Sequence, residues 1–290
     1  MNLFNLKDLS VEKINEILNL AEEFENGKKI DYKGEKIVAN LFFEPSTRTH
    51  YSFDTAELRL GLRTINFDAE NSSLKKGETL YDTVKTFESF GVDCLVIRHT
   101  DNEYYKEFAG KINIPILNGG DGSGSHPTQS LLDLYTIKKE FGKFEGLNIV
   151  IVGDIKHSRV AHTNIEVMKR LGMNVYVSGP EEYREPGYDF VELDSVLSKM
   201  DIVMLLRVQH ERHGNSENSM TDEKYNKAYG LNMNRINNMK EKSIVMHPAP
   251  FNRGAELTDD VVEHNKSRIF PQISNGVYIR MAVLNMALGE

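Results

Sequence analysis

The chain of 290 residues contains a single cysteine and no tryptophan. One cysteine cannot form a disulfide or a cysteine-rich metal site within one chain. Cys94 stands in the apolar run Cys94-Leu95-Val96-Ile97, which favours a small buried hydrophobic side chain over a nucleophile. We therefore predict that Cys94 is buried and takes no part in chemistry.

Long apolar runs and runs of basic residues are also missing. No stretch approaches the roughly 18 apolar residues of a membrane span, and the N-terminal residues lack the pattern of a secretory signal. The formal net charge is -8 and the basic residues are scattered, which is atypical of nucleic-acid binding. We expect a cytoplasmic protein that binds neither membrane nor nucleic acid.

Common nucleotide and metal motifs do not occur either. The segment Val152-Gly153-Asp154-Ile155-Lys156-His157-Ser158-Arg159 lacks the G-x-G-x-x-G spacing, so a nucleotide-dependent dehydrogenase is a weak alternative. The Walker pattern, H-E-x-x-H and clustered carboxylates are absent. We predict no metal and no organic cofactor.

The chain contains many short apolar runs. They alternate with segments of helical periodicity, and this pattern occurs in two successive halves. Its length is about twice that of a usual domain. The runs Ile149-Val150-Ile151-Val152 and Ile202-Val203-Met204-Leu205-Leu206 are continuously apolar, as in parallel strands covered on both faces. We predict an α/β fold with two doubly wound parallel-sheet domains joined by interdomain helices.

The expected elements follow from these patterns. A first amphipathic helix begins after Ser10, which caps it, and ends at Gly27. Strands are predicted near 37–43, 63–67, 94–98 and 115–118, and again near 148–153, 174–178, 201–206 and 243–247. Further helices are predicted near 46–60, 78–90, 101–109, 127–141, 160–171, 190–199 and 222–240. A last helix is expected at 275–290.

Unusual polar segments follow the strands of the first half, at the edge where parallel sheets bind ligands. Residues 43–49 place hydroxyls, a guanidinium and backbone N–H groups at a helix start, which suits a phosphate. The alternative is an ordinary Ser46 cap beside a solvated Arg48. Residues 118–129 form a glycine-rich loop, expected to be flexible, that leads into a helix and brings His126 and Gln129 to the crevice. A simple capping role for His126 is the alternative.

Other polar segments carry cations. Residues 72–79 hold the pair Lys75 and Lys76, although a solvated loop is the usual meaning of such a run. Arg207 ends a buried strand, where an arginine is costly unless an anion or an acceptor meets it. A salt bridge to an acidic neighbour is the alternative for Arg207. Together, Arg159 and Arg207 suit a small dicarboxylate.

In this order, the segments resemble the transcarbamoylase family over nearly the whole chain. Residues 43–49 and 126–129 are similar to elements shared by all transcarbamoylases, whereas residues 75–79, 207–209 and 247–250 are typical of the aspartate branch. The ornithine branch typically carries His-Cys-Leu-Pro where this chain has His247-Pro248-Ala249-Pro250. Two departures are Val160, where many relatives have threonine, and Ala249, where leucine is common.

The resemblance implies transfer of the carbamoyl group of carbamoyl phosphate to L-aspartate, giving N-carbamoyl-L-aspartate and phosphate in pyrimidine biosynthesis. It implies a carbamoyl-phosphate-binding domain at 1–133, to which the helix 275–290 returns, and an aspartate-binding domain at 134–274. A homotrimer with active sites shared between subunits is also implied. Whether regulatory chains exist stays open.

The resemblance also implies roles for individual residues. Those expected to act in catalysis are Arg48, Thr49, Lys76, Arg98, His126 and Gln129. Those expected to bind substrate are Ser46, Thr47, Arg48, Thr49, Ser72, Lys76, Arg98, His126, Gln129, Arg159, Arg207, Gln209, Pro248 and Ala249. In this assignment, residues 46–49 and Arg98 bind the phosphate. Arg159 and Arg207, with Gln209, bind the two carboxylates of aspartate. Ser72 and Lys76 come from a neighbouring subunit. The alternative is a two-domain protein that binds an anionic metabolite without transferring any group.

Overall fold

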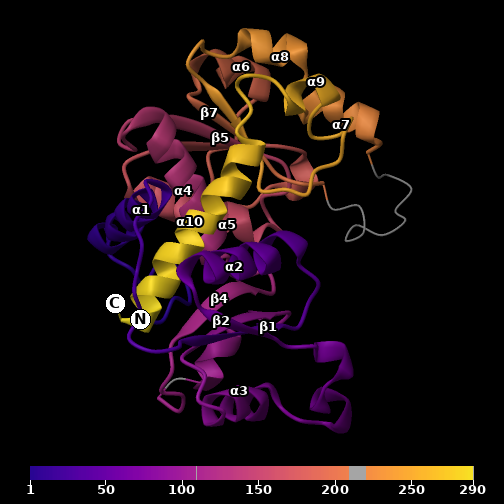
Figure 1. The fold of residues 1–290 in the computed structure, drawn as a ribbon. Coiled ribbons are helices and arrows are strands. Elements are labelled where there is room, and N and C mark those ends of the chain that lie inside the picture. Colours follow the sequence, from indigo (N-terminus) through magenta and orange to yellow (C-terminus); the bar gives the residue numbers. More distant parts are fainter. Residues whose placement is uncertain (109, 209–219, 290) are drawn as a thin grey trace. The chain divides into compact units, whose positions relative to one another are not determined.

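The computed structural model describes residues 1–108, 110–208 and 220–289. The chain divides into two compact units, one made of Met1–Tyr135 with Ile273–Glu290 and the other of Thr136–Gln272. Each unit contains a four-stranded parallel sheet with helices packed on it (Figure 1). The predicted fold class of two parallel α/β sheets is confirmed.

The first unit has the strand order β2-β1-β3-β4. Its strands are β1 (Ile37–Phe42), β2 (Arg63–Asn66), β3 (Cys94–His99) and β4 (Ile116–Asp121). Its helices include α1 (Val11–Glu25), α2 (Thr47–Leu60) and α3 (Leu80–Ser89), with short 3-10 helices η1 (Ala69–Asn71), η2 (Ser73–Lys76) and η3 (Tyr104–Phe108). The helix α4 (Pro127–Phe141) begins in this unit, and α10 (Ile269–Leu288) ends in it.

The local sequence explains several of these elements. The hydroxyl of Ser10 accepts a hydrogen bond from the backbone N–H of Lys13, so it caps α1 as predicted. The apolar face of α1 is buried, and Cys94 is fully buried in β3 as predicted. Gly61 ends α2 at φ 74°, a conformation that glycine adopts without strain. The N-terminus lies beside the last helix, because the Met1 amino group donates to the carbonyl of Ala287 at 3.4 Å.

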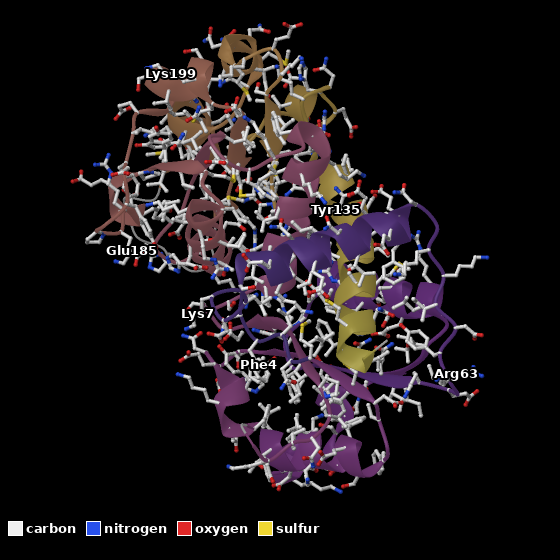
Figure 2. All side chains as sticks on the ribbon, turned by 90° about the vertical axis from the view of Figure 1, so that its left-hand side faces the viewer. Phe4, Lys7, Arg63, Tyr135, Glu185 and Lys199 are labelled. Atoms are coloured by element: carbon white, nitrogen blue, oxygen red, sulfur yellow. The ribbon has the colours of Figure 1, made fainter. Side chains whose placement is uncertain are left out.

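The second unit has the strand order β6-β5-β7-β8. Its strands are β5 (Asn148–Val152), β6 (Asn174–Ser178), β7 (Ile202–Leu205) and β8 (Ile244–Met246). Its helices are α5 (Arg159–Arg170), α6 (Leu193–Val196), α7 (Asp222–Tyr229), α8 (Met233–Asn238) and α9 (Asp259–Val262), with 3-10 helices η4 (Glu181–Tyr183) and η5 (Leu197–Lys199). Apolar side chains fill its core, while Lys199 is exposed on its surface (Figure 2).

The prediction of one helix over 222–240 is wrong. The chain leaves the helical conformation at Gly230, where any side chain would collide with the carbonyl of Ala255. Leu231 then pairs with Leu257, and α8 starts anew. The guanidinium of Arg235 donates to carbonyls at the end of α7 and to both carboxylate oxygens of Asp194, so it closes the break between the helices.

Three other predicted helices differ in type or length. The helix expected near 101–109 is the 3-10 helix η3, and the one near 190–199 is split into α6 and η5. The last helix starts at Ile269 rather than 275. Among the described residues, no helix combines the length and the apolar character needed to cross a membrane.

Candidate active site

A β-bulge in the first sheet places the central arginine of the site. In the pairing of β3 with β4, Ile97 lies opposite Asn118 but Arg98 lies opposite Gly120, so Gly119 is an extra residue. The carbonyl oxygen of Gly119 accepts a hydrogen bond from Nη1 of Arg98 at 3.3 Å. The bulge therefore fixes the guanidinium at the carboxyl end of β3.

Three of the predicted residues meet at this point. Nη1 of Arg98 lies 3.5 Å from Oγ1 of Thr49 and 3.5 Å from Nε2 of His126, and those two atoms are 3.4 Å apart. Thr49 lies in the first turn of α2, and His126 directly precedes α4. Both side chains are at least nine-tenths buried. Because a guanidinium only donates, Nε2 of His126 is the acceptor in this arrangement.

Glu44 is a member of this cluster that the sequence did not single out. Its Oε1 forms an ion pair of 2.6 Å with Nη2 of Arg98, and both side chains are mostly buried. Glu44 lies within the predicted phosphate segment, but nothing in a single sequence shows which arginine it contacts. This carboxylate thus neutralises part of the positive charge of Arg98.

The start of α2 does not match an ordinary serine cap. Ser46 occupies the N-cap position with extended backbone, yet its side chain makes no capping hydrogen bond. Thr47 and Arg48 are exposed in the following turn. Backbone N–H groups at a helix start attract anions, and hydroxyl and guanidinium groups strengthen that attraction. This geometry favours the phosphate interpretation of residues 46–49 over the simple cap.

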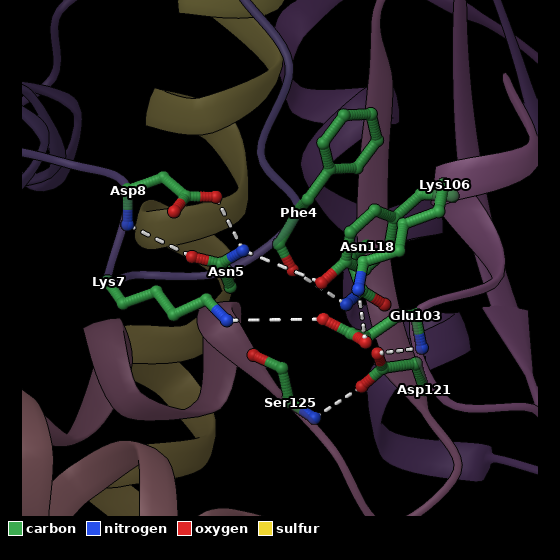
Figure 3. A network of polar contacts seen from close by, with 10 residues as sticks. Phe4, Asn5, Lys7, Asp8, Glu103, Lys106, Asn118, Asp121 and Ser125 are labelled. Carbon is green, nitrogen blue, oxygen red and sulfur yellow. Dashed lines mark hydrogen bonds and ion pairs between the residues drawn. The ribbon is translucent and has the colours of Figure 1, made fainter. Parts of the chain in front are cut away.

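The glycine-rich segment before His126 is more ordered than the loop that we expected. β4 continues through the glycines to Asp121, three residues beyond the predicted strand. One carboxylate oxygen of Asp121 accepts from the N–H of Ser125, and the other accepts from the N–H of Glu103 at 2.9 Å (Figure 3). The same network ties Asn118 to the carbonyl of Phe4 at 2.8 Å. These contacts set the path of the chain into His126.

Gln129 is held in one orientation by its own helix. Its Nε2 donates to Oδ1 of Asp133 at 2.9 Å, and both residues are buried. Because the amide nitrogen of Gln129 faces Asp133, its amide oxygen faces away from Asp133. Gln129 therefore presents an acceptor, which is the group needed to bind an amino group.

Ser72 and Lys76 are not brought to this cluster. They lie in the 3-10 turns between β2 and α3, where Ser72 caps η2 and donates to the carbonyl of Ala69 at 2.9 Å. Lys76 is exposed. In the part of the chain that the structure describes, no hydrogen bond or ion pair joins either residue to Arg98 or His126.

In the second unit, Arg159 is the first residue of α5, directly after the N-cap Ser158. The turn before it is shaped by Asp154, whose buried carboxylate accepts from the backbone N–H of His157 at 3.0 Å. Arg159 is half-buried at the carboxyl end of β5. Val160 follows it in the first turn of the helix, so the position carries no hydroxyl.

Arg207 follows β7, and its backbone is held by a buried carboxylate that the sequence did not reveal. Glu256 accepts hydrogen bonds from the N–H groups of Val208 and Asn252, both at 2.5 Å. Burial raises the pKa of Glu256, while these hydrogen bonds oppose that rise. The carbonyl of Val208 in turn accepts from the amide of Asn252 at 3.1 Å. Gln209 lies outside the described residues.

The segment from His247 to Pro250 forms a tight turn after β8. Nδ1 of the buried His247 accepts from the backbone N–H of Ala249 at 2.9 Å, and the backbone N–H of His247 donates to Oε1 of Gln272 at 2.9 Å. Ala249 adopts φ 53°, and the bond to Pro250 is cis. The hydrogen bonds of His247 set the path of the chain through Pro248 and Ala249, both of which are half-buried.

The described residues contain no group of three or more histidine, cysteine, aspartate or glutamate side chains arranged to hold a metal ion. The polar groups at the site are instead a guanidinium, an imidazole, hydroxyls and backbone N–H groups. Such groups bind oxyanions and polarise carbonyl oxygens.

Comparison with known proteins agrees with this chemistry. The family model for the aspartate/ornithine carbamoyltransferase carbamoyl-P binding domain matches residues 1–139, and that for the Asp/Orn binding domain matches residues 145–287.

Crystal structures of aspartate transcarbamoylase from Trypanosoma cruzi are similar over 98% of this chain. The complex with N-(phosphonacetyl)-L-aspartic acid has 32% identity, a TM-score of 0.86 and 94% of its own chain covered. The complex with carbamoyl phosphate has 33% identity, a TM-score of 0.84 and 95% coverage. That with carbamoyl aspartate and phosphate has 32% identity, a TM-score of 0.85 and 94% coverage. This chain belongs to the aspartate/ornithine carbamoyltransferase family.

Proposed function

We propose that this chain transfers the carbamoyl group of carbamoyl phosphate to L-aspartate, giving N-carbamoyl-L-aspartate and phosphate in pyrimidine biosynthesis. The observation that carries the proposal is the meeting of Thr49, Arg98 and His126 within 3.5 Å at the end of β3. The family match to both units and the similarity to aspartate transcarbamoylase complexes support it.

In this proposal, residues 1–133 with the C-terminal helix bind carbamoyl phosphate. The phosphate lies at the start of α2, held by Ser46, Thr47 and Arg48 with the help of Thr49 and Arg98. Charge-assisted hydrogen bonds of this kind contribute roughly 1.5 to 3 kcal/mol each. Arg98 exchanges Glu44 for the substrate anion when carbamoyl phosphate binds.

The carbonyl oxygen of carbamoyl phosphate faces Thr49, Arg98 and His126. The aspartate amine attacks the carbamoyl carbon, and these groups stabilise the oxyanion of the tetrahedral intermediate before the bond to phosphate breaks. By analogy with oxyanion-hole donors, each contributes about 3 kcal/mol. Because Nε2 of His126 accepts from Arg98, it must gain a proton before it can donate to that oxygen. A departing phosphate oxygen takes the amine proton.

The carbamoyl amino group is oriented by acceptors. The amide oxygen of Gln129 is turned away from Asp133, and the carbonyl of Pro248 is fixed by the turn at Ala249. Both are acceptors of the type that an amino group requires. Correct orientation of the reacting groups then lowers the barrier by itself.

Aspartate binds to residues 134–274 in this proposal. Arg159 and Arg207 take its two carboxylates, with Gln209 beside them. Arginine is suited to this task because its planar fork matches a carboxylate with two parallel hydrogen bonds. The carboxylate of Glu256 supports the backbone next to Arg207 and so preserves its direction.

We further propose a cytoplasmic homotrimer in which Ser72 and Lys76 complete the site of a neighbouring subunit. Among the described residues, neither side chain forms a hydrogen bond or an ion pair with the Arg98 cluster of its own chain, which supports a role in another copy. Mixing inactive Lys76→Ala and Arg48→Ala chains tests this, since exchange of subunits should restore some sites with both residues intact. Absence of any recovered activity after demonstrated exchange would refute the shared site.

The reaction itself is tested by identifying its product. Incubation with carbamoyl phosphate and L-aspartate should yield N-carbamoyl-L-aspartate and phosphate in equal amounts. Arg48→Ala should fold and yet lose turnover by orders of magnitude, because the phosphate then loses its guanidinium partner. Near-normal turnover of this variant would remove residues 46–49 from the mechanism.

A further inference from the structure

Arg280 is a buried cation of the first unit that the mechanism above does not use. It lies in α10, and its side chain is only 3% exposed. A charged group taken out of water is costly unless an opposite charge and hydrogen bonds compensate it. The charge of Arg280 must therefore be compensated by other groups.

The protein compensates this charge only in part. Nη1 of Arg280 donates to the carbonyl of Gly276 at 2.9 Å, and Nη2 donates to Oγ1 of Thr128 at 3.4 Å. The guanidinium carbon lies 5.1 Å from the centre of the Phe53 ring. Within the described residues, no carboxylate forms an ion pair with it, and its buried Nε has no hydrogen-bond partner.

The absence of a side chain at Gly276 leaves room for the guanidinium of Arg280. A side chain at position 276 would lie within 3 Å of Nη1 of Arg280, so only glycine leaves the space open. Burial, and then the positive charge of Arg98, lower the pKa of Arg280 to about 9. Arg98 is also the cation at the centre of the proposed phosphate site.

The contacts of Arg280 reach both helices that begin at that site. Thr128 lies in the first turn of α4, two residues after His126. Phe53 lies on α2, one turn beyond Thr49 on the same face. Figure 1 shows α10 crossing next to α2, and the contacts between them come from the middle of α10. Arg280 thus contacts the first turn of α4 and the second turn of α2.

We propose that Arg280 is a positioning residue for carbamoyl phosphate, whose phosphate group serves as the counter-ion that no carboxylate among the described residues supplies to this buried cation. The inference rests on the proposed function. Arg280 holds the first turn of α4 through Thr128, and its charge adds to that of Arg98 behind the bound anion. In the absence of an anion the two guanidinium groups repel each other, and binding relieves this repulsion.

Binding of inorganic phosphate to the full-length protein, measured by calorimetry, tests the proposal. Arg280→Met removes the charge but keeps an apolar side chain of similar length, and should raise the Kd for phosphate about tenfold. Arg280→Lys keeps the charge and should lose less. The matched control is Arg59→Met, because Arg59 also contacts an aromatic ring between α2 and α10, that of Tyr278 at 5.4 Å, but is exposed.

Thermal unfolding distinguishes this role from a purely structural one. Without phosphate, Arg280→Met should unfold at the wild-type temperature or above it, because an uncompensated charge has gone. With saturating phosphate, it should gain less than wild type does. In steady-state assays the KM for carbamoyl phosphate should rise while the KM for aspartate stays unchanged.

Several results would overturn the inference. An unchanged phosphate Kd in Arg280→Met, or a variant destabilised without phosphate whose gain from phosphate is normal, means that Arg280 is structural. If Arg280→Met does not fold, the phosphate Kd is measured for Arg280→Lys and Thr128→Val instead. Thr128→Val breaks the contact to α4 and leaves every charge in place. Phosphate affinity at the wild-type value in both variants refutes the role. If the wild-type chain itself binds no phosphate, the proposed function fails instead.

Discussion

Replacement of Glu57 by glutamine should change the pH dependence of stability in a defined direction. Glu57 is fully buried on α2, and its Oε2 accepts from Asn40 at 3.1 Å and from Thr64 at 2.7 Å. Its Oε1 and the oxygen of Asn40 are both buried without a hydrogen-bond partner. A protonated carboxyl group adds a donor where two acceptors lack one, so the neutral form suits this environment.

The magnitude follows from the pKa. Burial raises the pKa of Glu57 from 4.5 to about 7, with a further contribution from the charge of Asp54. The folded chain then holds the proton more tightly than the unfolded chain does. The resulting stabilisation is fully present below pH 4.5 and is lost as the pH rises through 7. A shift of this size corresponds to a loss of about 3 kcal/mol above pH 7.

Native-state hydrogen exchange of the β1 amides provides the assay, because it reports the opening of the first unit alone. Glu57→Gln carries no titrating proton, so its free energy of opening relative to wild type should rise between pH 5 and pH 8 by about 2 to 3 kcal/mol. Glu70→Gln, at an exposed position of η1, controls for the loss of one negative charge. A difference between variant and wild type that does not change with pH would refute the reasoning.

Three further predictions concern the site. Glu44→Gln should tighten phosphate binding severalfold, because Arg98 loses its competing carboxylate, and calorimetry would detect it; a weaker affinity would contradict the exchange of partners. Glu256→Gln should raise the KM for aspartate and leave phosphate binding unchanged, since its carboxylate holds the backbone beside Arg207; equal effects on both ligands would count against this. Asp121→Asn should lower kcat about tenfold or more, because it weakens the hydrogen bonds that hold the turn before His126. An unchanged kcat would contradict this role of Asp121.

The two sheets were predictable because their strands are short, apolar and nearly continuous. A run such as residues 149–152 is typical of a buried parallel strand, and the structure confirms that prediction. The helix break at Gly230 was not predictable, because its cause is the carbonyl of Ala255 and the side chain of Arg235. Contacts of that kind have no periodic signature.

The same distinction holds for the site. Ser46, Thr49, Arg98 and His126 stand at strand ends and helix starts, so parallel topology alone brings their segments to one edge. Glu44, Asp121 and Glu256 act by orienting other groups, and a single sequence shows no partner for them. Arg280 is the extreme case, since it lies 152 residues from Thr128, which it contacts.

The most direct test of the central claim is the release of phosphate from carbamoyl phosphate with each of two acceptors. The account predicts release that depends on L-aspartate, fails with L-ornithine, and is abolished by Arg48→Ala. Release with ornithine alone would contradict the aspartate assignment. Binding of carbamoyl phosphate with no release under either acceptor would contradict transfer itself and leave a protein that only binds an anionic metabolite.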